Sequence, residues 1–245
     1  MTSTRVGLIV PSSNTTMETE IPAMLRAREE IRPERFTFHS SRMRMQQVTP
    51  EQLRDMDDQS LRCARELADA EVDVMAYACL VAIMARATGY HRESQRRLAE
   101  IAEGTPVVSS AGALVEGLEH LGAKKISVIA PYMKPLTQTV CDYIEAEGVE
   151  VHDSISLEVP DNLAVGRLDP AQLVDIAAKV DTSGVDALVL SACVQMPSLP
   201  VVEQIQNAFD IPVVTASVAT VWKTLRELGL DPVAPRAGWL LADRG

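Results

Sequence analysis

The chain repeats itself: three segments of its first half return, in the same order, in its second half. VGLIVPSSN corresponds to KISVIAPYMK, VDVMAYAC to VDALVLSAC, and TPVVSSAGALVEGLEHLG to IPVVTASVATVWKTLRELG. The offsets between paired segments shrink from about 120 to about 106 residues, so the halves differ mainly in loop length. Such self-similarity between βα segments indicates duplication of one α/β unit.

Helical signals alternate with these strand-like segments. Residues 49–52 (TPEQ) form a capping box with proline at the first helical position, which predicts a helix to about Ala70. Residues 169–172 (DPAQ) repeat that pattern, and another helix is predicted over 134–146, ended by Gly148. Strands rich in Val, Ile and Leu that alternate with helices are typical of parallel sheets covered on both faces.

We therefore expect an α/β fold of two pseudo-symmetric, doubly wound parallel-sheet lobes with the active site between them. The N-terminal lobe is predicted to comprise residues 1–115 plus 220–245, with a C-terminal segment that crosses over. The C-terminal lobe is predicted to comprise residues 116–219. Because the sequence contains no Pro/Gly/Ser-rich linker, we expect the lobes to pack closely.

Charge and composition exclude several classes of function. The formal net charge of −11 argues against binding to nucleic acid or to an anionic membrane, because both need basic patches. We find neither a signal peptide nor an apolar run long enough to span a membrane, and four cysteines are too few for a disulfide scaffold, so we expect a cytoplasmic protein. The histidines are scattered and C-x-x-C pairs are absent, so we predict neither a metal nor another cofactor.

Two cysteines occupy the same place in the two halves. Cys79 and Cys193 each follow a buried strand, and ligands bind at the carboxyl ends of the strands in parallel sheets. One thiol from each lobe could thus face a small molecule from opposite sides. A helix starting beside either cysteine would lower its thiol pKa and hold a carboxylate. A lone cysteine is more often a buried core residue, which is how we interpret Cys63 and Cys141, but the repeat favours a function for this pair.

Other polar side chains follow the predicted strands. The first strand ends in PSSNTT, which contains Asn14 and could bind an anion or simply cap a helix. The equivalent strand of the second half ends at Tyr132, which could point into the cleft or into the core. Asn162, in a PDN loop, could bind a carboxylate or make a turn. Arg42 and Arg44 could clamp a carboxylate from a lid, but we favour a solvated loop for this segment.

Three segments carry a resemblance to a known family. IVPSSNTTMETEIPAML, YACLVAIM around Cys79 and SACVQMPSL around Cys193 together resemble the aspartate/glutamate racemase superfamily, and within it the maleate cis-trans isomerases. Amino-acid racemases usually carry Asn-Thr or Thr-His after their cysteines, whereas Leu-Val and Val-Gln follow here. Arylmalonate decarboxylases use a single cysteine at the second position, so Cys79 argues against that activity.

The resemblance implies a role for each candidate residue. Cys79 corresponds to the nucleophile and Cys193 to the proton donor. The substrate carboxylates would be held by three side chains and by backbone amides beside both cysteines: Asn14, Tyr132, Asn162, Leu80, Val81, Val194 and Gln195.

The implied reaction is a cofactor-independent isomerisation of maleate to fumarate through a succinyl-cysteine adduct. The substrate is thus a small dicarboxylate, the resemblance suggests a homodimer, and the loop of residues 42–48 is our candidate lid for excluding water. A second hypothesis is an amino-acid or hydantoin-type racemase that uses the two cysteines as opposed acid and base. A third is a dicarboxylate-binding protein without catalysis, which would have no need of two reactive thiols.

Overall fold

Two four-stranded parallel sheets form the framework of the molecule. The computed structural model describes residues 3–243. The strand order is β2-β1-β3-β4 in one sheet and β6-β5-β7-β8 in the other, so adding four to each label converts the first order into the second. The strands are β1 (Thr4–Pro11), β2 (Phe36–Met43), β3 (Val74–Tyr77), β4 (Val107–Ser109), β5 (Lys125–Ala130), β6 (Glu150–Ser156), β7 (Ala187–Ser191) and β8 (Val213–Thr215). The predicted duplicated α/β fold is confirmed.

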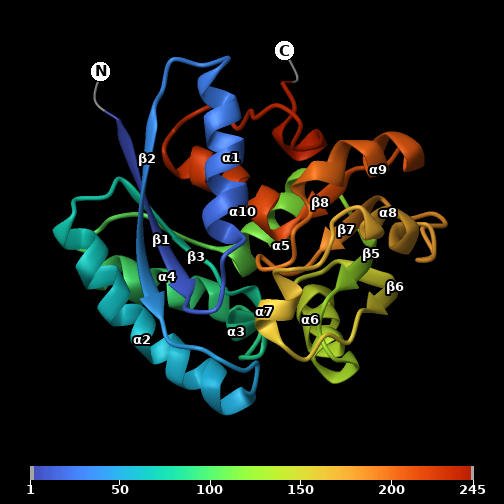
Figure 1. Cartoon of the computed structure of the whole chain (residues 1–245), viewed down its shortest axis with the longest axis horizontal. Coiled ribbons are helices and arrows are strands. Elements are labelled where there is room, and N and C mark those ends of the chain that lie inside the picture. Colours follow the sequence, from blue (N-terminus) through green and yellow to red (C-terminus); the bar gives the residue numbers. More distant parts are fainter. Residues whose placement is uncertain (1–2, 244–245) are drawn as a thin grey trace.

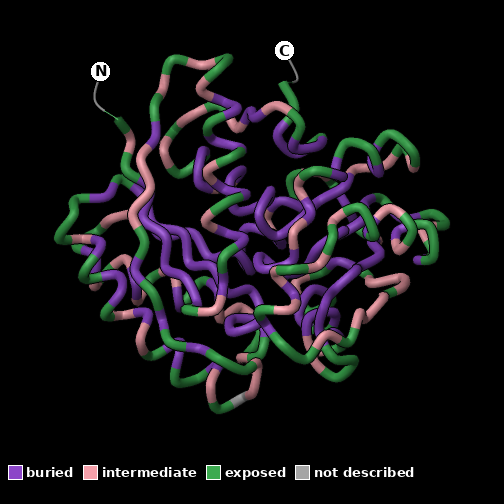
Figure 2. The backbone as a smooth tube through the Cα atoms, in the orientation of Figure 1, coloured by how far each residue is buried: buried purple, intermediate pink, exposed green. Residues whose placement is uncertain are grey.

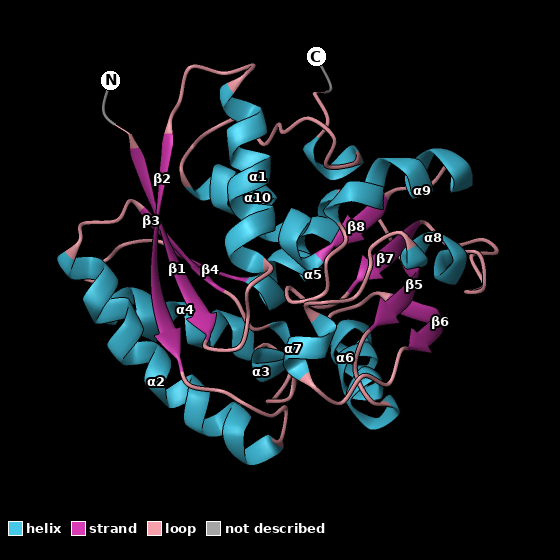
Figure 3. Cartoon of the chain, in the orientation of Figure 1, coloured by secondary structure: helices cyan, strands magenta, loops and turns pink. Residues whose placement is uncertain are grey.

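Helices flank both sheets, and the lobes lie side by side (Figures 1 and 3). They are α1 (Met17–Glu29), α2 (Pro50–Asp69), α3 (Leu80–Met84), α4 (Tyr90–Ile101), α5 (Ser110–His120), α6 (Lys134–Ala146), α7 (Asn162–Val165), α8 (Gln172–Ala177), α9 (Val202–Phe209) and α10 (Ala216–Glu227), with the 3-10 turns η1 (Leu199–Val201) and η2 (Trp239–Leu241). Among the described residues, no helix is both long and apolar enough to cross a membrane.

The central strands are buried because helices cover them on both sides. Every residue of β3, β4, β7 and β8 is buried, which explains why these segments read as continuous apolar runs rather than alternating ones. Figure 2 shows this buried framework within an exposed outer layer of helices and loops. The residues that directly follow each of these strands therefore lie in the interior of the molecule.

Helices α5 and α10 join the two lobes. They pack against each other, and α10 also contacts β3 and β4 of the first sheet and β8 of the second. Each helix starts directly after a strand, where Ser109 and Thr215 accept hydrogen bonds from Gly112 N at 3.0 Å and Val218 N at 3.1 Å. The equivalent caps reflect the duplication. The boundaries predicted for the lobes stay a prediction.

Two of the three predicted helices have the expected bounds, and one does not. The side chain of Thr49 caps α2 by accepting from Gln52 N, and α6 spans residues 134–146 as predicted, with Gly148 at a φ of +94° beyond its end. The second capping box was wrong: Asp169 accepts from Ala171 N at 2.9 Å and forms a turn, so α8 starts only at Gln172. A local side-chain bond competes with the helix there.

Candidate active site

Both repeated cysteines lie at the carboxyl ends of central strands, β3 and β7. Cys79 and Cys193 are each 6% exposed, and the two thiols are close enough to interact electrostatically. The structure thus brings one thiol from each lobe to a common place. Cys63 and Cys141 are also buried, and they lie within α2 and α6.

Cys79 is the residue directly before α3. Burial raises the pKa of its thiol to about 12, and the charges of Cys193 and Asp57 act in the same direction. A hydrogen bond from the backbone amide of Ala82 favours the thiolate, as expected at a helix N-terminus. The amide thus lowers the thiol pKa in the direction expected from the sequence, but a single amide does not offset the loss of water, which dominates.

Cys193 has different neighbours. Here the chain makes a turn at Val194 and Gln195 rather than a helix, and Gln195 N donates to the Cys193 Sγ at 3.4 Å. Burial raises the pKa of this thiol too, but a hydrogen bond with the Tyr132 hydroxyl and the amides of Gln195 and Met196 oppose that effect. The two thiols therefore have unequal surroundings: more donors stabilise a thiolate at Cys193 than at Cys79.

Asn14 is buried within the loop of residues 12–16, which connects β1 to α1. Its Oδ1 accepts from Met17 N, the first amide of α1, at 3.1 Å, so the oxygen of this side chain stabilises the start of the helix. Within the described residues 3–243, the side-chain NH₂ group of Asn14 has no hydrogen-bond acceptor, so it is free to donate to a ligand. An amide held by its oxygen, with its nitrogen available, is suited to a carboxylate ligand.

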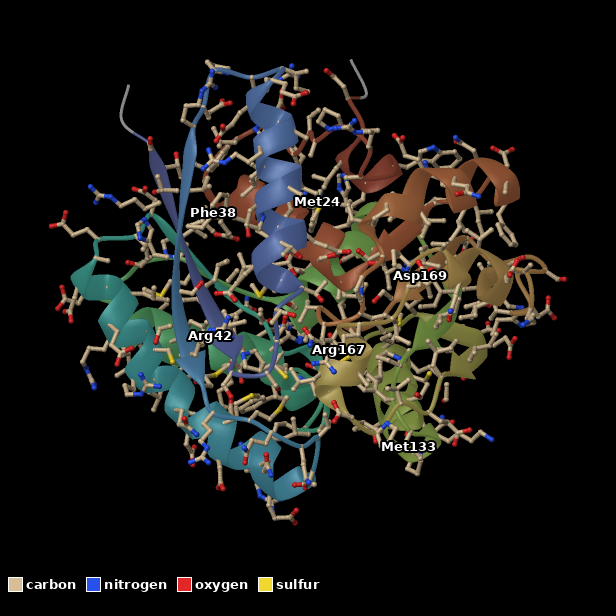
Figure 4. The ribbon with its side chains drawn as sticks, in the orientation of Figure 1. Met24, Phe38, Arg42, Met133, Arg167 and Asp169 are labelled. Atoms are coloured by element: carbon tan, nitrogen blue, oxygen red, sulfur yellow. The ribbon has the colours of Figure 1, made fainter. Side chains whose placement is uncertain are left out.

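Arg42 braces this same loop. Its Nη1 donates to Ser12 O and Asn14 O, both at 3.1 Å, and its Nη2 pairs with Glu18. Figure 4 labels Arg42 at the carboxyl end of β2, beside the start of the connection into α1. The guanidinium is thus engaged within the first lobe rather than acting as the carboxylate clamp considered from the sequence. Arg44 is exposed, and its backbone N donates to Gln59.

Tyr132 and Asn162 come from the second lobe. The Tyr132 hydroxyl donates to Ala192 O at 3.2 Å, and burial followed by the charges of Cys193 and Cys79 raises its pKa well above its usual range. Tyr132 therefore lies near both thiols. Asn162 is the first residue of α7, and its Nδ2 donates to Ser13 Oγ of the first lobe at 2.7 Å. Both residues sit where the lobes meet.

A cleft of about 1200 Å³ opens between residues of the two lobes. Tyr132 and Asn162 line it from the second lobe, and Ala82 and Arg86 line it from the first. Residues 46–48 of the candidate lid also line it. Tyr132, whose hydroxyl lies near both thiols, is thus also part of the wall of this cleft. Among residues 3–243, no group of three or more His, Cys, Asp or Glu side chains is arranged to hold a metal ion.

A buried carboxylate next to Cys79 escaped the sequence analysis. Asp57 is 4% exposed and accepts hydrogen bonds from Tyr77 Oη at 3.0 Å, Tyr90 Oη at 2.6 Å and Arg86 Nη2 at 3.1 Å. Arg86 also lies over the Tyr90 ring, 5.4 Å from its centroid. Asp57 belongs to α2, where several neighbouring acidic residues face solvent, so its sequence context carried no signal of burial.

Comparisons with known proteins agree on one family. A family model described as arylmalonate decarboxylase matches residues 6–241. The chain is 59% identical over 245 residues to a maleate isomerase from Geobacillus stearothermophilus, covering 98% of each chain.

Solved structures give the same result. A maleate isomerase from Pseudomonas putida S16, a cysteine-to-alanine variant with maleate, superposes with a TM-score of 0.98 at 55% identity and 99% coverage of both chains. A maleate cis-trans isomerase from Nocardia farcinica, a cysteine-to-serine variant with a covalently bound succinylcysteine intermediate, superposes with a TM-score of 0.95 at 46% identity and 100% coverage of both.

Proposed function

The chain belongs to the arylmalonate decarboxylase family and, within it, to the maleate isomerases, and we propose that it isomerises maleate to fumarate through a succinyl-cysteine intermediate. One observation carries this proposal. A chain 59% identical to a maleate isomerase over nearly its whole length brings a thiol from each lobe to one buried place. The succinylcysteine in the Nocardia farcinica relative supports the covalent step.

The reaction must break the π bond between C2 and C3 of maleate temporarily, because that bond prevents rotation about the C2–C3 axis. The reactive form has Cys79 as thiolate and Cys193 as thiol. The Cys79 sulfur bonds to C2 of maleate, the π electrons move to C3, and Cys193 gives its proton to C3. The C2–C3 bond is then single and rotates. The Cys193 thiolate takes a proton back from C3, the double bond re-forms, and Cys79 leaves as thiolate, which yields fumarate.

The unequal surroundings of the thiols support this division of roles. The amides of Gln195 and Met196, and the Tyr132 hydroxyl in place of its bond to Ala192 O, would stabilise the thiolate that Cys193 becomes after giving up its proton. Cys79 has fewer such donors and a pKa raised to about 12. A thiolate of higher pKa is intrinsically the stronger nucleophile. We therefore assign addition to Cys79 and proton transfer to Cys193.

Local donors must bind the two substrate carboxylates, since the net charge of −11 repels a dianion. We assign this role to the side chains and backbone amides expected from the sequence: Asn14, Tyr132, Asn162, Leu80, Val81, Val194 and Gln195. The free NH₂ group of Asn14 and the positions of Tyr132 and Asn162 on the cleft wall support the assignment.

The proposal also covers the cellular location, the oligomeric state, the lid and the lobe boundaries. Four free cysteines support a reducing, cytoplasmic environment. We keep the homodimer, the lid of residues 42–48 and the lobe boundaries (1–115 plus 220–245, and 116–219) as proposals. The position of residues 46–48 in the lining of the cleft supports the lid.

The test is conversion of maleate followed by proton NMR in D₂O. We expect fumarate from the parent protein and none above background from Cys79→Ala or Cys193→Ala. A mass increase equal to succinyl on the Cys79 peptide is expected in Cys193→Ala. Cys63→Ala and Cys141→Ala are matched controls with buried thiols outside the site, and they should retain turnover. Normal turnover in Cys79→Ala would contradict the mechanism, and solvent exchange at Cα of an amino acid in place of fumarate formation would favour a racemase.

A further inference from the structure

Gln195 is a buried side chain whose amide is fully used within the protein. It is 2% exposed. Its Oε1 accepts from Thr15 N at 2.9 Å and Thr16 N at 3.4 Å. Its Nε2 donates to Ser13 O and Asn162 O, both at 3.0 Å. All four hydrogen-bonding positions of a carboxamide are thus occupied.

These four bonds connect three segments that carry the proposed site. The first is the loop of residues 13–16, which belongs to the first lobe and contains Asn14. The second is the start of α7 in the second lobe, where Asn162 lies. The third is the turn after β7, because the backbone N of Gln195 donates to the Sγ of Cys193 at 3.4 Å. One residue therefore contacts a thiol and both loops that present the carboxylate-binding amides.

We propose that Gln195 is a positioning residue that ties the two lobes together at the active site and sets Asn14 and Asn162 relative to Cys193. The inference deepens the proposed function and rests on it for the identity of the substrate. Gln195 would thus act in two ways. Its backbone amide faces the thiol of Cys193. Its side chain bonds only to protein groups, and it holds the loop of residues 13–16 and the start of α7 in place. Small displacements of such groups are expected to cost catalysis more than stability.

Gly166 makes room for this arrangement. A Cβ at position 166 would lie 2.5 Å from Gln195 Nε2 and 3.0 Å from its Cδ. The φ of Gly166 is −68°, which any residue adopts, so the backbone conformation does not require a glycine here. A glycine is required because the Gln195 amide approaches this position so closely. Because the obstructing atoms are the far end of a side chain rather than backbone, Gly166→Ala should displace that amide and break some of its hydrogen bonds.

The chemistry of the amide explains why glutamine is needed. The first-lobe loop presents two N–H donors on one side, and two carbonyl oxygens lie on the other. Glutamate can accept from the amides of Thr15 and Thr16 but cannot donate to Ser13 O and Asn162 O when ionised. Methionine has a similar length but makes none of these bonds. Gln195→Glu should therefore keep part of the arrangement, and Gln195→Met should lose all of it.

The test combines both positions. We expect Gln195→Met to lower kcat/KM for maleate on the order of 100-fold and Gly166→Ala to lower it about tenfold. Both variants should also lower Tm, because buried hydrogen bonds are lost. In a Gln195→Ala background, Gly166→Ala should cause no further loss, because no long side chain remains to displace. Gln206→Met is the matched control: this buried glutamine of the second lobe binds Val213 N and Trp239 N away from the site, so its variant should lose Tm and keep its kinetics.

A second readout does not depend on the substrate. Alkylation of Cys193 by iodoacetamide, measured by peptide mapping in a Cys79→Ala background, should be about tenfold faster in Gln195→Met and Gly166→Ala than without these changes. If the parent forms no fumarate, the proposed function fails and alkylation still decides the role of Gln195. Parent-like kinetics and alkylation in a folded Gln195→Met protein would overturn the inference. So would an equal loss of kcat/KM from Gly166→Ala with and without Gln195.

Discussion

At the scale of single residues, burial dominates the chemistry of the site. The thiols of Cys79 and Cys193, to which we assign the chemistry, both have a raised pKa because the interior lacks the water that would stabilise a thiolate. The thiolate needed for addition is therefore a minor species at neutral pH. The charge of the buried Asp57 adds repulsion to the same effect.

The activity should rise with pH. A raised thiol pKa means that the thiolate fraction at Cys79 increases roughly tenfold per pH unit until the pKa is approached, here about 12. We expect kcat/KM for maleate to increase from pH 6 to pH 9 with a slope of about one on logarithmic axes. Initial rates of fumarate formation at subsaturating maleate measure this. A profile already flat at pH 6 would show that the thiolate forms at a much lower pKa.

Replacing Asp57 tests how much its charge adds to the raised pKa of Cys79, whose main cause is burial. Asp57→Asn keeps a side chain of the same size beside Tyr77 and Tyr90 but removes the charge that raises the pKa of Cys79. The rising limb of the pH profile should move toward acid by less than about one pH unit. Asp58→Asn, at the adjacent exposed position on α2, is the matched control and should leave the limb in place.

At the scale of elements, polar side chains hold helices and loops together across the lobes. Glu20 on α1 is 6% exposed, and it accepts from Ser198 N at 2.6 Å, Leu199 N at 2.8 Å and Ser217 Oγ at 2.5 Å. Burial raises its pKa, while these donors oppose the rise. One carboxyl group thus joins α1 to the turn before η1 and to the start of α10.

Glu20→Gln should change how stability depends on pH. A carboxyl with a raised pKa holds its proton longer in the folded than in the unfolded state, so stability falls as pH rises from the unfolded value of about 4.5 through the folded pKa. Glutamine keeps an acceptor for the two amides and a donor for Ser217, without that penalty. The Tm of the variant relative to the parent should therefore increase from pH 4.5 to pH 8, as calorimetry would measure. A difference that is constant with pH would contradict this account.

Secondary structure was predictable where local signals agree. Thr49 and the following proline start α2 as expected, because the cap and the helix require only neighbours in sequence. The similar DPAQ pattern failed at residues 169–172, since the Asp169 side chain finds a closer backbone partner. Local chemistry alone did not distinguish the two outcomes.

At the scale of the whole molecule, an acidic protein acts on an acidic substrate. The formal net charge of −11 disfavours the approach of a dianion, while Arg54 and Arg86 line the cleft. Arg86 is partly neutralised by Asp57, and Arg54 lies near Glu51 at 3.6 Å. The long-range field should therefore outweigh these two cations at low salt.

Salt should accelerate the capture of substrate. Because salt screens the repulsion between maleate and the protein, we expect kcat/KM to rise a few-fold between roughly 0.01 and 0.3 M ionic strength. Comparing sodium with potassium chloride separates screening from specific ion effects. A fall in kcat/KM with salt would instead show that the arginines of the cleft dominate the approach.

The sequence by itself determined the duplicated α/β fold and the two cysteines at equivalent strand ends. Both follow from what the sequence shows directly: apolar runs and caps among near neighbours, and the same order of segments in the two halves. Only the tertiary structure decided the unequal surroundings of the two thiols, the engagement of Arg42 with Glu18, the burial of Asp57 and the contacts of Gln195. The physical reason is that each of these depends on groups distant in sequence, such as Ser13 and Gln195, and on the water that their packing excludes.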